Sequence, residues 1–440
     1  MKKLLLFILL TTFTVNAQFW TEKASSFTAA SRGINSISIV DDNVIWVKAY
    51  DGTASAVATI KEYAKSTNGG NNWTSSSFTL TSGSPSLAIS CITATDANTA
   101  WVSAYPTASA AGGIWKTVNG GANWTKQTTA VFTTAAAFAN VVYFWDANNG
   151  FCMGDPVGGY YEIYTTTNGG TNWTRVPSAN IPLPADSGEY GYVANFDVVG
   201  DVVWFGTNYG RIYRSVDKGL NWTVAQSPLN DFGGESENGS YTFTSATKGL
   251  LSSNSGQLWT TTDGGENWDP LAFTGPFYTA DLSYVPGTSS VICTGSATGN
   301  SGSSYSLDHG LTWTQIDNNI QHTICEFRNT TVGFSGGFNE NATSKGIFKY
   351  TGTVLALPTT EKAVFSVYPN PATDFITVKG ASAASIKAIQ VVDINGRTVK
   401  SLKFDGITET QVNISDLNAG VYVVTVSSEQ GVSSTKIIKN

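Results

Sequence analysis

Charged residues are scarce in this chain. They make up 13% of its 440 residues, against about 25% in an average soluble domain. The formal net charge is −7, it becomes −9 without Lys2 and Lys3, and no run of basic residues occurs. Nucleic acids and anionic membranes are bound through clusters of Lys and Arg. The sequence therefore gives no electrostatic case for either partner, and we expect no nucleic-acid binding.

Histidine and cysteine are also few. The chain has two histidines, His309 and His322, and no pair of its four cysteines has CxxC spacing. Zinc sites are built from closely spaced His and Cys, so we expect no metal. The sequence contains no phosphate loop, nucleophile elbow or cofactor fingerprint, so we expect no cofactor. In an exported protein two disulfides are possible, and buried thiols are equally compatible with the apolar surroundings; the cysteines are Cys91, Cys152, Cys293 and Cys325.

Long hydrophobic runs are absent except at the N-terminus. Lys2 and Lys3 precede an apolar run over residues 4–13, and small residues follow at 15–17. The run is shorter than the ~20 residues that span a bilayer, and the order of basic, apolar and small residues is that of a secretory signal. We predict a signal peptide over 1–17, a mature chain that starts at Gln18, and no membrane span.

A short motif recurs through the chain. Six segments have the pattern Ser/Thr-x-Asp/Asn-x-Gly-x-x-Trp, at intervals of 45 to 51 residues: 66–73, 117–124, 166–173, 215–222, 261–268 and 306–313. A period of that length indicates one supersecondary unit per repeat, stacked or arranged in a ring.

The residue types of the motif suit a tight turn. The hydroxyl and the Asp or Asn side chain can bond to the turn backbone, the glycine permits positive φ, and the tryptophan buries a large ring. The third position is Asn68, Asn119, Asn168, Asp217, Asp263 or Asp308, and the eighth is Trp73, Trp124, Trp173, Trp222, Trp268 or Trp313. Because Asn and Asp interchange, whereas a calcium site favours carboxylates, we interpret the motif as a structural turn.

The segments around each motif predict one propeller blade. In the second repeat, apolar stretches at 92–95, 100–104 and 113–117 precede the motif, and a fourth starts at Trp124. Four antiparallel strands of this kind form one blade. A seventh unit from His322 has only three stretches and no motif, and residues 19–22 provide a strand without a motif. We predict an all-β fold with a seven-bladed β-propeller over 18–353, in which the N-terminal strand completes the last blade.

The motif resembles the Asp-box, or BNR, repeat. Propellers of sialidases, of xyloglucan-type glycoside hydrolases, of sortilin-like receptors and of the photosystem II assembly factor-like group carry it. The resemblance implies that the motif lies on the face opposite the usual ligand face. It does not decide function, because the group contains both enzymes and binding proteins.

The C-terminal region is a second unit. After a linker over 354–364, residues 365–440 contain alternating strand-like segments, which predict a small Ig-like β-sandwich. Tyr-Pro-Asn-Pro at 368–371, the Asp-x-x-Gly turn at 393–396, Leu-x-x-Gly-x-Tyr at 417–422 and the terminal lysine segment closely resemble the type A sorting domain of the Bacteroidetes type IX secretion system. The resemblance implies export through the periplasm, handling by the translocon and a sorting peptidase, and a secreted or cell-surface location.

A sialidase is not expected. Its site needs three convergent arginines, whose planar guanidinium groups hold a carboxylate. The predicted propeller contains Arg32, Arg175, Arg211, Arg214 and Arg328. By strand position we place the first and third near the ligand face and the other three toward the opposite face.

The longest loops of the presumed ligand face suggest a site. Residues 178–191 and 226–241 are insertions at blades three to five, and long loops on a rigid scaffold commonly form binding surfaces. The site hypothesis comprises Asp155, Tyr160, Glu189, Tyr190 and Arg211. We favour non-catalytic recognition of a glycan or a protein. The alternatives are a glycoside hydrolase or lyase that uses a carboxylate pair from the same loops, and an envelope assembly factor with a flat apolar patch.

Overall fold

The computed structural model describes residues 18–53, 59–81, 86–107, 111–132, 138–352, 355, 365–380, 385–393, 397–428 and 431–440. The predicted signal peptide lies outside these residues, as does the predicted linker except for Leu355. The chain forms two compact units, residues 1–357 and 358–440, and each is described by itself. In the described part no helix is long and apolar enough to cross a membrane.

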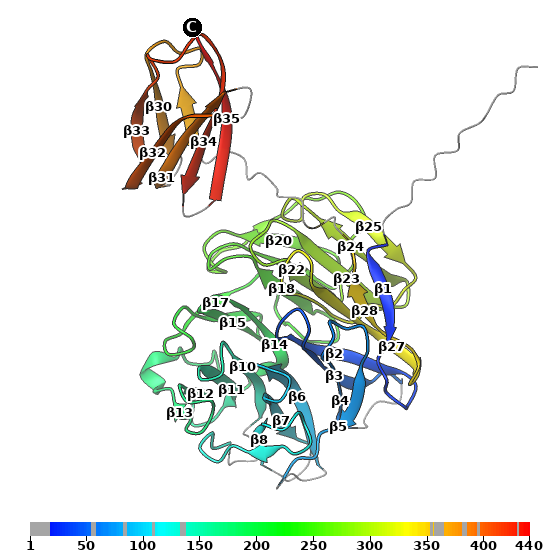
Figure 1. Ribbon diagram of the computed structural model, residues 1–440. Coiled ribbons are helices and arrows are strands. Elements are labelled where there is room, and N and C mark those ends of the chain that lie inside the picture. The colour runs from blue at the N-terminus through cyan, green and yellow to red at the C-terminus, as the bar shows by residue number, and fades with distance from the viewer. Residues whose placement is uncertain are drawn as a thin grey trace, which may run out of the picture. The chain divides into compact units, whose positions relative to one another are not determined.

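The first unit is a ring of seven antiparallel blades (Figure 1). Blade one contains β2 (Arg32–Ile39), β3 (Ile45–Asp51), β4 (Glu62–Ser66) and β5 (Thr74–Ser77); blade two β6 (Leu87–Ala94), β7 (Ala100–Pro106), β8 (Gly113–Thr117) and β9 (Thr125–Lys126); blade three β10 (Ala139–Phe144), β11 (Gly150–Pro156), β12 (Tyr161–Thr166) and β13 (Thr174–Arg175); blade four β14 (Gly191–Val199), β15 (Val202–Thr207), β16 (Arg211–Ser215) and β17 (Thr223–Gln226). Blade five contains β18 (Gly239–Phe243), β19 (Gly249–Ser253), β20 (Leu258–Thr261) and β21 (Asp269–Pro270), and blade six β22 (Asp281–Tyr284), β23 (Val291–Ala297), β24 (Asn300–Ser306) and β25 (Thr314–Asn318).

The last blade joins the two ends of the ring. It consists of β26 (Cys325–Phe327), β27 (Gly333–Asn341), β28 (Ser344–Tyr350) and the N-terminal strand β1 (Trp20–Ala24). β1 pairs with β28 from Trp20↔Tyr350 to Ala24↔Gly346, and the Trp20 indole donates to Ser303 Oγ of blade six at 3.0 Å. The predicted seven-bladed propeller is therefore confirmed, and the N-terminal strand β1 closes it.

Aromatic side chains pack the blades against one another. Trp101 stacks on Phe144 of the next blade with ring centroids 3.6 Å apart, and Trp204 stacks on Phe243 at 3.8 Å. Each tryptophan is fully buried in the second strand of its blade. The near-continuous apolar sequence of these second strands follows from their burial on both faces.

The repeated turns are held by their own side chains. In the sixth, Ser306 Oγ accepts the Gly310 N–H at 2.8 Å, Asp308 Oδ1 accepts the Thr312 N–H at 2.9 Å, and the Trp313 indole donates to Gly310 O at 2.9 Å. The corresponding Ser66 and Asn68 bonds in the first turn measure 2.9 and 3.0 Å. Asn and Asp therefore perform the same backbone-capping task, which leaves these side chains occupied within the turn.

All four cysteines are buried and free. The structure thus has thiols where disulfides were one of two open alternatives. Cys91 and Cys325 belong to different blade interfaces, where each packs among apolar side chains.

The second unit is a two-sheet sandwich. One sheet has the order β29 (Phe365–Tyr368), β30 (Phe375–Gly380), β33 (Glu409–Asn413), and the other β32 (Thr398–Ile407), β31 (Ile386–Asp393), β34 (Gly420–Ser428), β35 (Gly431–Lys439). Ile376, Val391 and Val424 are among the residues of its core, which draws on both sheets. The small C-terminal sandwich expected from the sequence is confirmed.

Candidate functional site

Glu189 and Arg211 form a buried ion pair at the rim of blade four. Their Oε2 and Nη1 atoms are 2.8 Å apart, and the exposed fractions of the two side chains are 0% and 15%. Glu189 Oε2 also accepts the Ala185 N–H at 2.6 Å, and Arg211 Nη2 donates to Leu183 O at 3.3 Å. The pair therefore fastens the 178–191 loop, which includes the 3-10 turn η1 (Ser178–Asn180), onto β16.

Asp155 connects blade three to blade four. Its Oδ1 atom accepts the Asn140 amide at 2.7 Å and the Gly191 N–H, at the start of β14, at 3.1 Å. Burial raises the pKa of Asp155 to about 6, although both hydrogen bonds act in the opposite direction. The Oδ1 atom of this carboxyl group is thus occupied by two contacts within the protein.

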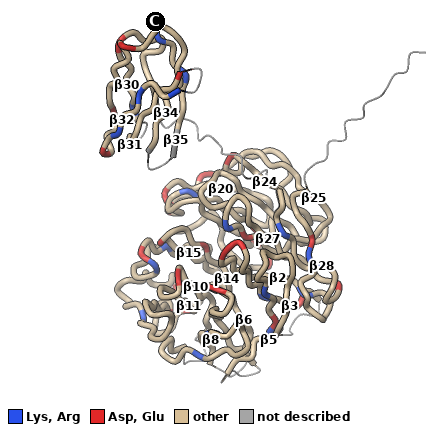
Figure 2. The backbone as a smooth tube through the Cα atoms, in the orientation of Figure 1, with Lys and Arg blue, Asp and Glu red and all other residues tan. Residues whose placement is uncertain are grey.

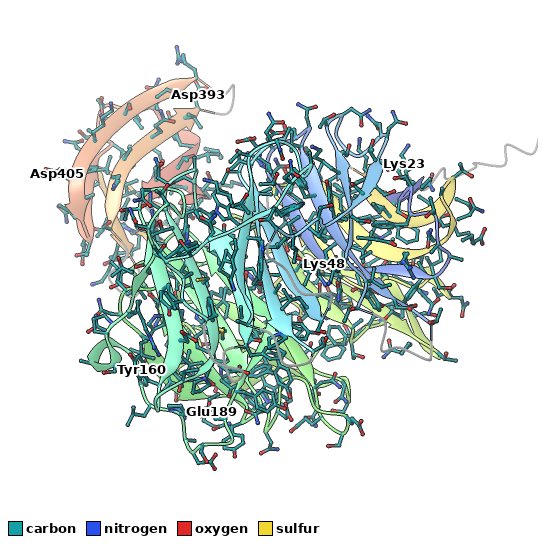
Figure 3. The ribbon with its side chains drawn as sticks, turned by 90° about the horizontal axis from the view of Figure 1, so that it is seen from below. Lys23, Lys48, Tyr160, Glu189, Asp393 and Asp405 are labelled. Carbon is teal, nitrogen blue, oxygen red and sulfur yellow. The ribbon has the colours of Figure 1, made fainter. Side chains whose placement is uncertain are left out.

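The two predicted tyrosines each contact a neighbouring side chain. The Tyr160 ring lies under the Arg175 guanidinium, 4.4 Å from its centroid, and Arg175 Nη2 donates to Val157 O at 3.0 Å. Tyr190 is 43% exposed and meets Tyr192 edge-on at 5.5 Å. Figure 3 shows Tyr160 and Glu189 at the same end of the ring.

The position of Arg175 corrects the sequence analysis. We expected it toward the face that carries the repeated turns, because it follows a motif tryptophan. Instead its side chain extends along β13 to the 157–160 turn between β11 and β12, on the opposite face. A long side chain can thus reach a face several residues away from its own backbone position.

The structure pairs Glu189 with Arg211 and holds Asp155 separately on Asn140 and Gly191, and all three charges act on the buried Tyr161 hydroxyl. Burial raises the pKa of Tyr161, and the charges of Glu189 and Asp155 raise it further while Arg211 lowers it. Tyr160 and Tyr190 contact Arg175 and Tyr192 instead. The charged members are turned into the protein, and Tyr190 is the member most exposed to solvent.

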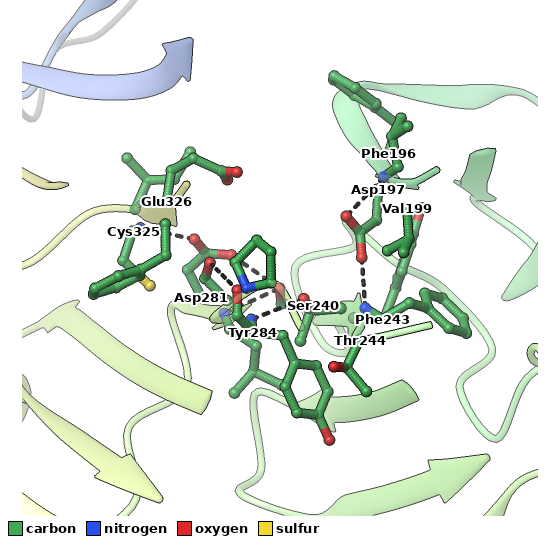
Figure 4. Close-up of a pocket in the computed structure, with 18 of the residues that line it drawn as sticks. Phe196, Asp197, Val199, Ser240, Phe243, Thr244, Asp281, Tyr284, Cys325 and Glu326 are labelled. Atoms are coloured by element: carbon green, nitrogen blue, oxygen red, sulfur yellow. Dashed lines mark hydrogen bonds between the residues drawn. The ribbon is translucent and has the colours of Figure 1, made fainter. Parts of the chain in front are cut away.

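The central channel holds acidic residues that the sequence analysis missed. A cavity of about 380 Å³, lined by the inner strands of blades four to seven, contains Asp197, Asp281 and Glu326 (Figure 4). A neighbouring cavity of about 570 Å³ shares Asp197 and Glu326 and extends to blades one to three. The missed signal was an acid flanked by apolar residues in an inner strand, as in Phe196-Asp197-Val198.

These three acids have different partners. Asp197 accepts the Phe243 N–H at 2.5 Å, and Asp281 accepts the Cys325 N–H at 2.9 Å, so each caps an inner strand of a neighbouring blade. Burial raises the pKa of both to about 6. Glu326 has an exposed side chain that faces the cavity, and desolvation inside the ring, followed by the charges of the other two acids, raises its pKa well above the usual value. In the described residues no group of three or more His, Cys, Asp or Glu has an arrangement that could hold a metal ion.

Charge is otherwise sparse on the ring. Figure 2 shows Lys and Arg interspersed with Asp and Glu, with most of the backbone carrying neither. In the 178–191 loop and its neighbours, exposed aromatic and aliphatic side chains lie beside hydrogen-bonded acids.

The second unit matches a known protein family. Residues 366–440 match the family described as "Secretion system C-terminal sorting domain". The chain carries a type IX sorting domain. It is therefore exported and is either secreted or held at the cell surface.

Solved structures resemble the propeller. A structure of YCF48 bound to D1 peptide is 16% identical, with a TM-score of 0.53, and the match covers 77% of this chain and 98% of that one. YCF48 from Cyanidioschyzon merolae is 17% identical, with a TM-score of 0.52 and coverages of 76% and 99%. At these identities the likeness shows the fold alone. A search of curated proteins gives no match.

Proposed function

We propose that the exported propeller is a non-catalytic recognition protein for a glycan or a protein ligand, which binds at the rim of blades three to five. The site comprises Asp155, Tyr160, Glu189, Tyr190 and Arg211. The observation that carries the proposal is the occupation of the acids. A glycosidase needs two carboxyl groups that reach the substrate, whereas Glu189 is enclosed with Arg211 and Asp155 is bonded to Asn140 and Gly191.

The exposed part of the rim suits binding. Leu183 is 66% exposed, Tyr190 43% and Val193 39%, and the backbone that carries them is fixed by the Glu189–Arg211 pair and by the Tyr190 N–H bond to Asn208 Oδ1 at 2.7 Å. A tyrosine ring on a loop that is already ordered provides contact area with little loss of conformational entropy on binding. In this proposal the acids and Arg211 hold the loop, and Tyr190 contacts the ligand.

The second loop supports the same surface. Tyr192 donates its hydroxyl to Asp231 Oδ1 at 2.6 Å, which ties the start of blade four to the 226–241 insertion. Tyr209 donates to Asp186 Oδ1 at 2.8 Å and closes the other side of the 178–191 loop. The rim is thus one hydrogen-bonded surface that extends from blade three to blade five.

We propose that residues 1–17 are a cleaved signal peptide, that the six turns are Asp-box repeats, and that the propeller, linker and sorting domain have the boundaries 18–353, 354–364 and 365–440. The type IX translocon and its sorting peptidase are the proposed partners in export.

The test is a panel of glycans, polysaccharides and envelope proteins, screened with the mature chain for both binding and release of reducing sugar. We expect binding without release. Tyr190→Ala should abolish this binding, whereas Val118→Ala, at a residue that is 66% exposed within a repeated turn of blade two, should leave it intact. Release of reducing sugar that stops in Asp155→Asn would instead establish the glycosidase alternative.

A further inference from the structure

A cavity of about 540 Å³ lies between the outer strands of the last two blades. One wall is formed by β1 and the residues before it, and the other by β25 of blade six (Figure 1). Six apolar or aromatic side chains line the cavity: Phe19, Trp20, Tyr305, Ile316, Ile320 and Phe348. Among them Ile320 is 40% exposed. The cavity therefore offers apolar contact area at blades six and seven, away from the blades of the proposed rim site.

The strand β1 has an unpaired edge beside this cavity. It pairs with β28, and no other strand or isolated bridge of the described residues meets it. Directly after β1, the Ser25 N–H donates to Lys345 O at 3.0 Å. Residues that bond to the partner strand alternate with residues that do not. The N–H and C=O groups of Trp20, Glu22 and Ala24 therefore point away from β28, and such a row is a template for a further strand.

The length of β1 suits it to strand addition. β1 and β25 have five residues each, whereas the outer strands β9, β13 and β21 of blades two, three and five have two. An added strand is held by several successive main-chain hydrogen bonds, and its alternate side chains fill pockets. β1 combines an edge of sufficient length with an adjoining cavity that such side chains can enter.

The charged residues of the cavity are acidic. Glu22 and Asp317 line it, and its lining contains no Lys or Arg. Burial raises the pKa of Glu22, and the charge of Lys345 acts in the opposite direction. Lys345 is itself paired with Glu340 at 2.6 Å. Because complementary charge selects the partner of a binding surface, the cavity favours a cationic side chain.

Hydrogen bonds fix the position of the Asp317 carboxyl group. Its Oδ2 atom accepts the Ser303 hydroxyl at 2.9 Å and lies 3.1 Å from His322 Nε2. The Trp20 indole donates to the same Ser303 oxygen, so β1 is tied to this carboxyl group. The Asp317 side chain is 17% exposed, and its Oδ1 atom has no hydrogen-bond partner in the described chain. Asp317 is thus a fixed anionic residue of the cavity wall that retains an unsatisfied acceptor.

We propose that this groove binds an extended peptide segment of a partner protein, which adds as a strand to the free edge of β1 and places a Lys or Arg side chain beside Glu22 and Asp317. Main-chain hydrogen bonds to β1 provide affinity, and the side chains that enter the cavity provide specificity. A peptide is favoured over a small organic cation because the cation would leave the edge of β1 unused. The site goes beyond the proposed function, since it involves neither Tyr190 nor the 178–191 loop.

The experiment measures binding of the fluorescently labelled peptide Arg-Thr-Leu-Thr-Arg to the mature chain by anisotropy at low ionic strength. In an added strand its Arg and Leu side chains lie on one face, toward the cavity. We expect saturable binding, and binding about tenfold weaker, which corresponds to about 1.4 kcal/mol, when Glu replaces Arg in the peptide. The fully N-methylated peptide keeps the charge but cannot donate to the edge, so it should not bind.

Three variants locate the site on the chain. Glu22→Gln should weaken binding about threefold, as loss of an exposed ion pair does. Ala24→Pro removes an outward N–H and no bond to β28, a change that edge strands tolerate, and it should weaken binding at least about tenfold, by more than 1.4 kcal/mol. Asp269→Asn is the matched control, because Asp269 is an exposed acid on the two-residue outer strand β21; it should leave binding unchanged.

Four results would overturn the inference. The first is no binding of the Arg peptide at ~1 mM, where the free energy of binding is about −4 kcal/mol. The second is equal binding of the N-methylated peptide, which indicates charge attraction without strand addition and is read on the wild-type chain even where Ala24→Pro does not fold. The third is equal binding of the Glu peptide. The fourth is a dimer of the chain that Ala24→Pro dissociates, which gives the edge to a second copy. Tyr190→Ala should leave peptide binding intact, so the proposed function is tested separately.

Discussion

Lys48 should destabilise the propeller at neutral pH. It lies on β3 opposite Ser36 and is 5% exposed (Figure 3 labels it). Burial lowers its pKa from 10.5 to about 8, an effect that the Cys91 thiol offsets in small part. At about 1.36 kcal/mol per pKa unit, this shift amounts to a cost of about 3 kcal/mol whenever the ammonium is charged in both states.

Because the pKa of Lys48 is lower in the folded chain than in the unfolded chain, the stability cost depends on pH. Below pH 8 the folded and unfolded chains both carry the proton, so the full cost applies. Between about 8 and 10.5 the folded chain has released the proton and the unfolded chain retains it, so the free energy of unfolding rises with pH. Above 10.5 the penalty from Lys48 is absent.

The test compares wild type with Lys48→Met by urea unfolding from pH 6 to pH 10. Methionine fills a similar volume without charge. The variant should be more stable by about 3 kcal/mol at pH 7, and the difference should shrink as the pH rises above 8. A variant that is no more stable than wild type at pH 7, or a difference that does not change with pH, would refute the reasoning.

Three further predictions follow from the fold and the rim. Trp20→Ala should lower the free energy of unfolding, measured in urea, by about 3 to 5 kcal/mol, because it removes a large buried ring from the strand that closes the last blade. A loss below about 1 kcal/mol would show that β1 does not close the ring. Asp308→Asn should change stability by less than about 0.5 kcal/mol and Asp308→Ala should cost about 1 to 3 kcal/mol, because an amide oxygen can still cap Thr312; equal losses would contradict the capping role. Arg211→Ala should cost about 3 to 5 kcal/mol because it strands a buried carboxylate, and adding Glu189→Gln should restore part of that loss; additive losses in the double variant would mean that the pair is not coupled.

The architecture could be predicted because its determinants are local. The hydrogen bonds that form each repeated turn lie within eight residues, as those of Ser306–Trp313 show. The motif therefore predicts the turn without knowledge of distant contacts. The number of blades, seven, was predicted because the last unit has only three strands and the N-terminus has one strand without a motif. The structure pairs that strand, β1, with β28 of the last unit. In a closed ring, the N-terminal strand is the natural fourth strand of an incomplete last blade.

The site could be predicted only in part, because the direction of a loop side chain depends on long-range contacts. Sequence position brought attention to Asp155 and Glu189, but only the structure shows that Gly191, Asn140 and Arg211 occupy them. The acids of the channel escaped notice for a related reason. Strand alternation does not say which residue faces the axis of a ring.

The central claim is that the rim recognises a ligand without transforming it. The most direct test is a crystal structure of the mature protein with the tightest ligand from the binding panel. The account predicts an intact ligand against Tyr190, with the Glu189–Arg211 pair undisturbed beneath it. A cleaved ligand, or one bound in the channel against Glu326, would contradict the account.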